Sequence, residues 1–164
     1  YAGIVGGAHY SHEGSGSNYL CLHTEPQWLN YKDGYQYSAG RALLYGAEYQ
    51  TPDDIFPNKH LLDNDVPCVV CQAQHRFSII MIPGRIQCPN SSWVMEYKGY
   101  LMAQRYEYNG KTTYECMDEN PETIDGGGEN KEGVLFYPTE AYCGSLPCPK
   151  YVAGREIACV VCSF

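Results

Sequence analysis

Residues 68–71 read Cys-Val-Val-Cys, and residues 159–162 read the same four letters. Valine favours extended chain, and on a strand two residues three positions apart point to opposite faces of the sheet. The two cysteines of each tetrapeptide therefore cannot bond each other. Cys-x-x-Cys is also a zinc motif, but zinc knuckles usually turn tightly between the cysteines, and 87 residues separate the two pairs here. With nine cysteines in 164 residues, the pattern favours disulfides and an oxidising compartment over zinc.

The shared tetrapeptide is the last of a series of matches between two parts of the chain. The earlier matches run in the same order, and their offset falls steadily from 96 to 92 residues before it reaches 91 at the tetrapeptide, as small loop deletions would produce. They are Tyr1-x-Gly3 with Tyr97-x-Gly99, Tyr10 with Tyr106, Tyr19-x-Cys21-x4-Pro26 with Tyr114-x-Cys116-x4-Pro121, and Leu43-x-Tyr45-x-x-Glu48 with Leu135-x-Tyr137-x-x-Glu140. The series predicts one compact domain, 1–164, made of repeat one (1–72), a connector (73–95) and repeat two (96–164).

Glycine and proline punctuate the whole chain and leave only short segments for regular structure. The segments rich in β-branched and aromatic residues predict strands, at 66–71, 77–82, 93–97, 134–137 and 157–161. The nearest candidate for a helix is Arg41–Gln50, and it is short. We therefore expect a mainly β, disulfide-bonded single domain whose two tandem β-rich repeats are related by a pseudo-twofold axis.

The repeats also suggest which cysteines pair. Cys143 and Cys148 are close enough to close a local Gly/Pro turn. By the repeat, Cys21 bonds Cys68 or Cys71, while Cys88, whose Cys-Pro pair leads into repeat two, and Cys116 bond Cys159 and Cys162 in either order. The odd cysteine is then Cys68 or Cys71, as a thiol or as a bridge between two chains.

Composition excludes several classes of function. The net charge is −8 with only 11 lysines and arginines and no basic cluster, so nucleic acid is not an expected partner. The apolar runs are too short for a membrane helix, so membrane insertion is not expected either. A chain that starts at Tyr1 suggests a mature, secreted form. Nucleophile-elbow and phosphate-loop motifs are absent, so we expect no enzyme, although the matched Glu48 and Glu140 leave a glycosidase carboxylate pair open.

Motifs along almost the whole chain carry a family resemblance: GGAHYSHEGSGSNYLC (6–21), YGAEYQT (45–51), LLDNDVPCVVC (61–71), GYLMA (99–103), CGSLPCP (143–149) and GREIACVVC (154–162). The sequence resembles the non-collagenous head domain of short-chain, spongin-type collagens, and more closely a galactose-binding lectin of the sea-anemone type. The resemblance implies an extracellular module that binds terminal galactose on cell-surface glycans. The alternative is an extracellular structural or assembly head without a sugar ligand.

The two repeats differ where a binding site would need polar groups. Asp63-Asn64-Asp65 matches Gly154-Arg155-Glu156, and His9, Trp28 and Gln50 have no like residue opposite them. The vicinal 3- and 4-hydroxyls of galactose need a bidentate carboxylate or amide, or a Ca²⁺ ion, and its apolar face needs an aromatic ring. The candidates are Glu48, Asp63 and Asp65 for calcium, and His9, Tyr10, Trp28, Gln50 and Asn64 for the sugar. The alternative for 63–65 is an Asx turn that leads into a strand.

A single site in repeat one also has a consequence for assembly. A lectin that agglutinates cells must present at least two sites, so one site per chain predicts a homodimer, most simply a twofold one.

Overall fold

The computed structural model describes residues 1–35, 40–52 and 54–164, and these residues form strands and loops without a helix. The strands are β1 (Ala2–Gly7), β2 (Leu20–His23), β3 (Tyr45–Tyr49), β4 (Pro67–Val69), β5 (Ile79–Pro83), β6 (Val94–Ala103), β7 (Glu115–Asp118), β8 (Val134–Pro138) and β9 (Ala158–Ser163). The mainly β expectation is confirmed. No helix of the described chain could therefore cross a membrane.

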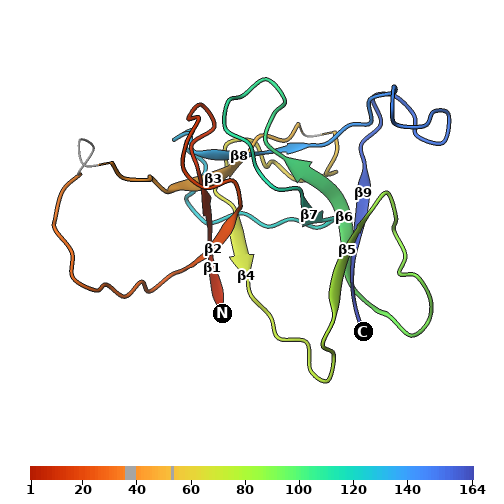
Figure 1. The fold of residues 1–164 in the computed structure, drawn as a ribbon, viewed down its shortest axis with the longest axis horizontal. Helices are drawn as coiled ribbons and strands as arrows, with labels where there is room; N and C mark the ends of the chain where they lie inside the picture. The colour runs from red at the N-terminus through yellow and green to blue at the C-terminus, as the bar shows by residue number, and fades with distance from the viewer. Residues whose placement is uncertain (36–39, 53) are drawn as a thin grey trace.

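The strands form one curled, mixed sheet (Figure 1). Its order is β2-β1-β3-β8-β6-β9-β5, with β4 also paired to β1 and β7 also paired to β6. All pairs are antiparallel except β3 with β8, which is parallel. This parallel pair joins the strands of residues 1–72, called here the first half, to those of residues 96–164, the second half.

The central strands of the two halves have matching neighbours. β1 pairs with β2, β3 and β4, and β6 pairs with β7, β8 and β9. The registers also match at positions that correspond in sequence: Gly3 lies opposite Cys68, and Gly99 lies opposite Cys159. An isolated bridge, Glu48 with Asp65, likewise has its counterpart in Glu140 with Glu156.

Glycine is required where the central strand of each half meets its hairpin partner. A Cβ atom on Gly3 would lie 2.2 Å from the carbonyl oxygen of Leu22, and one on Gly99 would lie 1.8 Å from that of Met117. Real Cβ atoms do not approach backbone this closely, so only glycine allows these strands to pair.

The parallel contact between the halves joins positions that do not correspond. Ala47 and Tyr49 in β3 lie opposite Val134 and Phe136 in β8. By the sequence offset, the counterparts of Val134–Phe136 are residues 42–44, just before β3. A twofold axis would repeat each contact in both directions, so this contact is heterologous rather than the one that the expected pseudo-twofold relation would produce.

The main core lies where the two halves meet. It contains buried residues of the first half, such as Tyr49, Phe56 and Val66, and of the second half, such as Met102 and Phe136. A smaller cluster in the second half surrounds the Cys116–Cys159 disulfide. The shared core makes the association of the halves part of folding.

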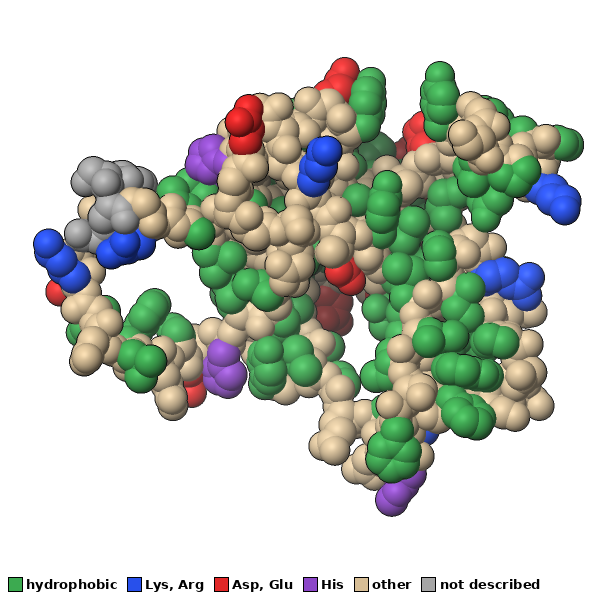
Figure 2. All heavy atoms as spheres, in the orientation of Figure 1, with side chains coloured by type: hydrophobic (Ala, Val, Ile, Leu, Met, Phe, Trp, Pro, Cys, Tyr) green, Lys and Arg blue, Asp and Glu red, His purple; other side chains and the backbone are tan. Residues whose placement is uncertain are grey.

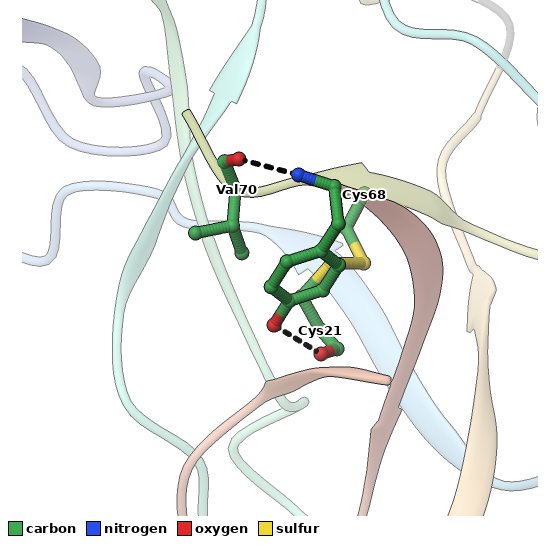
Figure 3. The surroundings of a disulfide bond; sticks show 4 residues. Cys21, Cys68 and Val70 are labelled. Carbon is green, nitrogen blue, oxygen red and sulfur yellow. Dashed lines mark hydrogen bonds between the residues drawn. A yellow bond between two sulfur atoms is a disulfide. The ribbon is translucent and has the colours of Figure 1, made fainter. Parts of the chain in front are cut away.

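Four disulfides are formed, and they select among the pairings that the sequence left open. They are Cys21–Cys68, Cys116–Cys159, Cys88–Cys162 and Cys143–Cys148. The first of these is held by the first residue of the chain (Figure 3): the amino group of Tyr1 donates to the Val70 oxygen at 3.0 Å, and its hydroxyl donates to the Cys21 oxygen at 3.0 Å. Cys71 is exposed and is the one cysteine without a disulfide in the described chain.

The sequence identified only some of the strands. The helix candidate at Arg41–Gln50 is wrong, since Tyr45–Tyr49 forms β3. β1, β2 and β7 were not predicted, because β1 is half glycine and the other two have four residues each. Their extended form follows from pairing in the sheet rather than from local propensity.

Candidate functional site

The acidic residues that the sequence singled out lie together on the first half. Glu48 is on β3, and the turn 61–66 returns antiparallel to it, so that Asp65 bridges to Glu48 and the Asp63 amide donates to the Tyr49 oxygen at 2.9 Å. Asp63 has a left-handed backbone, with φ of 59°, and its counterpart Gly154 has φ of 73°. The first half therefore keeps a carboxylate at a position where glycine carries no backbone strain.

Asp63, predicted as a calcium ligand, is paired with Gln50, one of the predicted sugar ligands. The Gln50 amide nitrogen donates to Asp63 Oδ1 at 2.6 Å. Asn64 serves the turn instead, since its amide nitrogen donates to the backbone oxygens of His60 and Leu62 at 3.2 and 3.1 Å. Asn64 thus bonds the backbone of its own turn, next to the polar Gln50–Asp63 pair.

Glu48 is almost completely buried, with 2% of its surface exposed. Its Oε1 accepts a hydrogen bond from the backbone amide of Lys131 at 2.8 Å, and its Oε2 has no partner in the described chain. Burial raises the pKa of the Glu48 carboxyl, and backbone hydrogen bonds from Lys131 and Glu132 oppose that shift.

Lys131 also neutralises the third acidic residue. Its ammonium lies 2.9 Å from Asp65 Oδ2. The three candidate calcium ligands thus have different partners: backbone amides for Glu48, an amide side chain for Asp63 and an ammonium for Asp65. In the described chain no three acidic, histidine or cysteine side chains converge to hold an ion, so the carboxylates as arranged do not fit a shared calcium.

His9 and Tyr10 adjoin the same segment of the second half. Their rings stack with centroids 4.6 Å apart, and His9 also contacts the His12 ring at 4.6 Å. A hydrogen bond to the Glu132 side chain raises the pKa of Tyr10. Partial burial, then the charge of His12, lowers the pKa of His9. Both residues therefore lie beside the Lys131–Glu132 pair that also serves Glu48.

Trp28 stands apart from these residues. It is 74% exposed and makes no ring contact in the described chain. It belongs to the connection between β2 and β3, whose described parts form a wide loop away from the sheet (Figure 1). The arrangement within one chain does not bring Trp28 to the acidic cluster.

A large hollow of the described chain lies mainly on the second half. It is a groove of about 940 Å³. Most of its lining residues are the sequence counterparts of first-half residues that the segment including β8 covers. Its lining side chains include Gln50, Gln104, Tyr106, Tyr114, Glu140 and Tyr142. Both side-chain amide atoms of Gln104 are buried and have no hydrogen-bond partner in the described chain.

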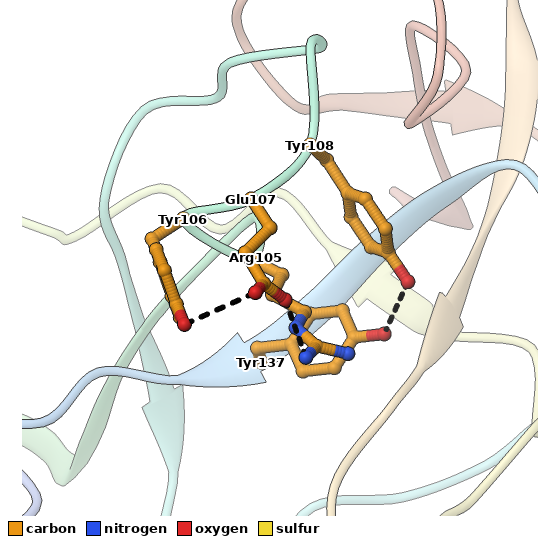
Figure 4. A network of polar contacts seen from close by, with 5 residues as sticks. All are labelled: Arg105, Tyr106, Glu107, Tyr108 and Tyr137. Carbon is orange, nitrogen blue, oxygen red and sulfur yellow. Dashed lines mark hydrogen bonds and ion pairs between the residues drawn. The ribbon is translucent and has the colours of Figure 1, made fainter.

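Polar contacts order the residues along one side of the groove (Figure 4). Glu107 accepts from the Tyr106 hydroxyl at 3.2 Å and pairs with the guanidinium of Arg105. The hydroxyls of Tyr108 and Tyr137 lie 3.3 Å apart. The groove therefore combines aromatic rings with fixed polar groups, as binding surfaces do.

Of the residues that line the groove, the sequence singled out only Gln50, for the sugar, and Glu140, as the match of Glu48. The comparison of the two repeats looked for polar and aromatic residues present in one and absent in the other, and it therefore pointed to the first half. The tyrosines Tyr106 and Tyr114 were seen only as matched positions. The groove can be recognised because its residues are exposed, whereas the matched residues of the first half are covered. This difference is visible only once the tertiary contacts are known.

No protein-family model matches the chain, and searches of curated proteins and of solved structures found no match either.

Proposed function

We propose that this protein is a secreted lectin that binds terminal galactose through the Gln50–Asp63 pair of the first half. The observation that carries the proposal is the backbone of Asp63. A non-glycine residue is kept in a left-handed conformation, at a cost of about 1 kcal/mol or more, where the other half has glycine. Its carboxylate faces the Gln50 amide in a half-exposed loop.

The chemistry of this pair suits galactose. A carboxylate accepts hydrogen bonds and an amide both donates and accepts, so together they can hold two vicinal hydroxyls. The 3- and 4-hydroxyls of galactose lie on the same side of the ring and present such a pair of groups. The sugar's apolar face needs an aromatic ring, and Tyr10 is the candidate on the first half, although its ring already contacts His9 and Tyr108.

Calcium forms no part of the mechanism proposed here. An ion could join Asp65 only by displacing the Lys131 ammonium, which already supplies a positive charge there. Calcium therefore stays a sequence prediction, and binding measured with and without a chelator tests it.

Two further features belong to the proposal. Four disulfides support an oxidising, extracellular location. The matching registers of β1 and β6, and the equivalent disulfides Cys21–Cys68 and Cys116–Cys159, support an origin of residues 1–72 and 96–164 as tandem repeats, joined by 73–95.

The test uses the substitution Asp63→Gly, which removes the carboxylate and relaxes the backbone. We expect the variant to fold with unchanged or slightly higher thermal stability, because glycine is favoured at this φ, and to lose binding to immobilised galactose by at least about tenfold. His75→Gly is the matched control, since His75 is exposed and also left-handed, with φ of 58°, and lies in the loop between β4 and β5. It should bind like the wild type.

Each outcome of this test decides something. Full binding by a folded Asp63→Gly variant would overturn the proposed site, and absence of binding to any galactose-terminated glycan by the wild type would overturn the proposed function. Loss of wild-type binding on chelation would restore calcium to the site. Release of product from a chromogenic galactoside would favour an enzyme over a lectin.

The alternative function, an extracellular assembly head, has its own supporting observation. The groove lies mainly on the second half, and no described segment covers it. The matching surface of the first half is covered by the segment that includes β8.

A further inference from the structure

One surface of the first half is covered by residues 119–136, the segment that follows β7 and includes most of β8. Backbone hydrogen bonds hold it there: Tyr10 N to Gly133 O at 2.8 Å, Asp65 N to Gly127 O at 3.0 Å, Ile124 N to Asp65 O at 3.2 Å and Gln50 N to Phe136 O at 2.9 Å. Together with the parallel β3–β8 pair, these contacts bury Glu48.

Side chains complete this internal interface. The ring of Tyr19 stacks on Phe136 with centroids 4.0 Å apart, and its hydroxyl donates to the Leu135 oxygen at 3.1 Å. Tyr19 and Phe136 both pack on the main core. The covering segment thus provides one aromatic ring, one backbone acceptor and a strand edge.

The corresponding surface of the second half is open. Tyr114, the counterpart of Tyr19, is 58% exposed, and Tyr106, the counterpart of Tyr10, is 89% exposed. Glu140 is exposed, although its counterpart Glu48 is buried. In the first half, β8 pairs with one edge of β3 at residues 47–49. The matching residues of the second half are 139–141, and in the described chain no strand pairs with the corresponding edge there. These open positions line the groove.

The covering segment corresponds to residues 24–44 of the first half, and most of the described residues there are exposed. We call residues 24–35 the arm, and Leu43 and Leu44 follow it before β3. Leu44 is the counterpart of Phe136, and it is 53% exposed. Trp28 and Leu29 are still more exposed. Figure 2 shows hydrophobic side chains gathered on this projecting loop. Apolar residues on an extended loop are typical of a segment that docks elsewhere.

Leu44 of a chain lies too far from the groove of that same chain to dock there. β3 and β8 are parallel, and Ala47 lies opposite Val134. Along the common strand direction, Leu44 lies three residues before this pair, and Thr139 lies five residues after it. The two are therefore eight residues apart along the sheet, or about 26 Å at about 3.3 Å per residue. A second chain has no such restriction.

We infer that the groove of the second half is the docking site for the arm and for Leu43–Leu44 of a second copy of this chain. Leu44 packs on the Tyr114 ring as Phe136 packs on Tyr19, and the Leu43 oxygen accepts from the Tyr114 hydroxyl. The backbone of 42–44 lies along the 139–141 edge, whose residues line the groove. Tyrosine-rich surfaces with polar rims are typical of such interfaces.

The contact is heterologous, so each chain has one arm to donate and one groove to fill. Reciprocal docking closes a ring of two or more chains, and a ring of two is the twofold homodimer that the sequence suggested. The inference does not rest on galactose binding. Gln50 of the proposed sugar site also lines the groove, but the docking contacts inferred here are made by Tyr114 and the 139–141 edge.

The experiment measures self-association of the whole chain by light scattering over a concentration series. We expect the wild type to form a closed oligomer, and the variants Leu44→Asp (arm damaged) and Tyr114→Lys (groove damaged) to be monomeric, with at least about a tenfold weaker association. A mixture of the two variants should recover a dimer, because one still has its groove and the other still has its arm. Phe77→Asp, which also alters an exposed apolar residue, is the control and should associate normally.

The mixture separates the inference from simple misfolding. Recovery of a dimer requires both variants to be folded and the contact to join arm to groove. A wild type that stays monomeric at the highest concentration would overturn the inference, and so would association that survives both substitutions or two folded variants whose mixture stays monomeric. Galactose binding measured on the same samples reports on the proposed function separately.

Discussion

At the scale of single residues, the same amino acid at matched positions has opposite surroundings in the two halves. Glu48 is buried under the covering segment, whereas Glu140 is exposed at the groove. The sequence treated both as equivalent carboxylates. The local sequence around Glu48 and Glu140 does not distinguish them, because Glu48 is buried by Lys131 and its neighbours, 83 residues away in the chain.

The burial of Glu48 predicts a dependence of stability on pH. The folded protein raises the pKa of this carboxyl and so binds its proton more tightly than the unfolded chain does. That contribution to stability is present below the ordinary pKa of glutamate, about 4.3, and is lost as the pH rises through the raised value. Denaturant unfolding of Glu48→Gln should therefore show a smaller fall in unfolding free energy than the wild type between about pH 4 and about pH 8.

Glu140→Gln is the matched control for that measurement. Its side chain is exposed, so its unfolding free energy should follow the wild-type curve when monomers are compared. Parallel curves for Glu48→Gln and the wild type would contradict the role given to Glu48.

The candidate site shows how far residue-level prediction reached. Glu48, Asp63, Asp65 and Gln50 do lie together, because a short turn returns along β3 and because cysteine pairing holds the strand after it. The charge partner Lys131 could not be foreseen, since it comes from the other half. Without it, three clustered carboxylates suggested an ion.

At the scale of elements, the strand pairs depend on glycines as much as on apolar residues. β1 and β6 each need glycine where the backbone of the neighbouring strand is closest. The sequence comparison contained this signal as Tyr-x-Gly in both repeats, but propensity rules count glycine against a strand. The long-range pairing therefore overrode the local preference.

Gly99→Ala tests this constraint. The new methyl group would lie 1.8 Å from the Met117 oxygen, so β6 and β7 would have to separate. We expect the unfolding free energy to fall by about 3 kcal/mol or more, measured by thermal or denaturant unfolding. Gly46→Ala is the matched control in a strand, because no atom lies within 4 Å of its added methyl group, and it should change stability by less than about 1 kcal/mol. Equal stability of the two variants would contradict the close approach.

At the scale of the whole molecule, the two halves share one core, but they contact each other through surfaces that do not correspond. The second half covers the first through the β3–β8 pair, and no described segment of the first half makes the reverse contact. A heterologous contact of this kind leaves an arm at one end and a groove at the other.

The two proposals together predict a separation of sugar binding from agglutination. If each chain has one galactose site and assembly requires the arm, Leu44→Asp should bind galactose as a monomer but fail to agglutinate galactose-bearing cells, since agglutination needs at least two sites. A binding assay and a haemagglutination assay on the same sample measure both properties. Agglutination by the monomeric variant would show a second sugar site within one chain.

The sequence by itself determined the class of structure. Nine cysteines, short β-rich segments and an ordered series of internal matches predicted a mainly β, disulfide-bonded chain, because these features depend on residue type and spacing. Only the tertiary structure decided which matched surface is covered and which is open. That outcome depends on the register of one parallel strand pair, which buries Glu48 and Tyr19 and leaves Tyr114 exposed. Register arises from side chains of both halves packing into a common core, and no local pattern records it.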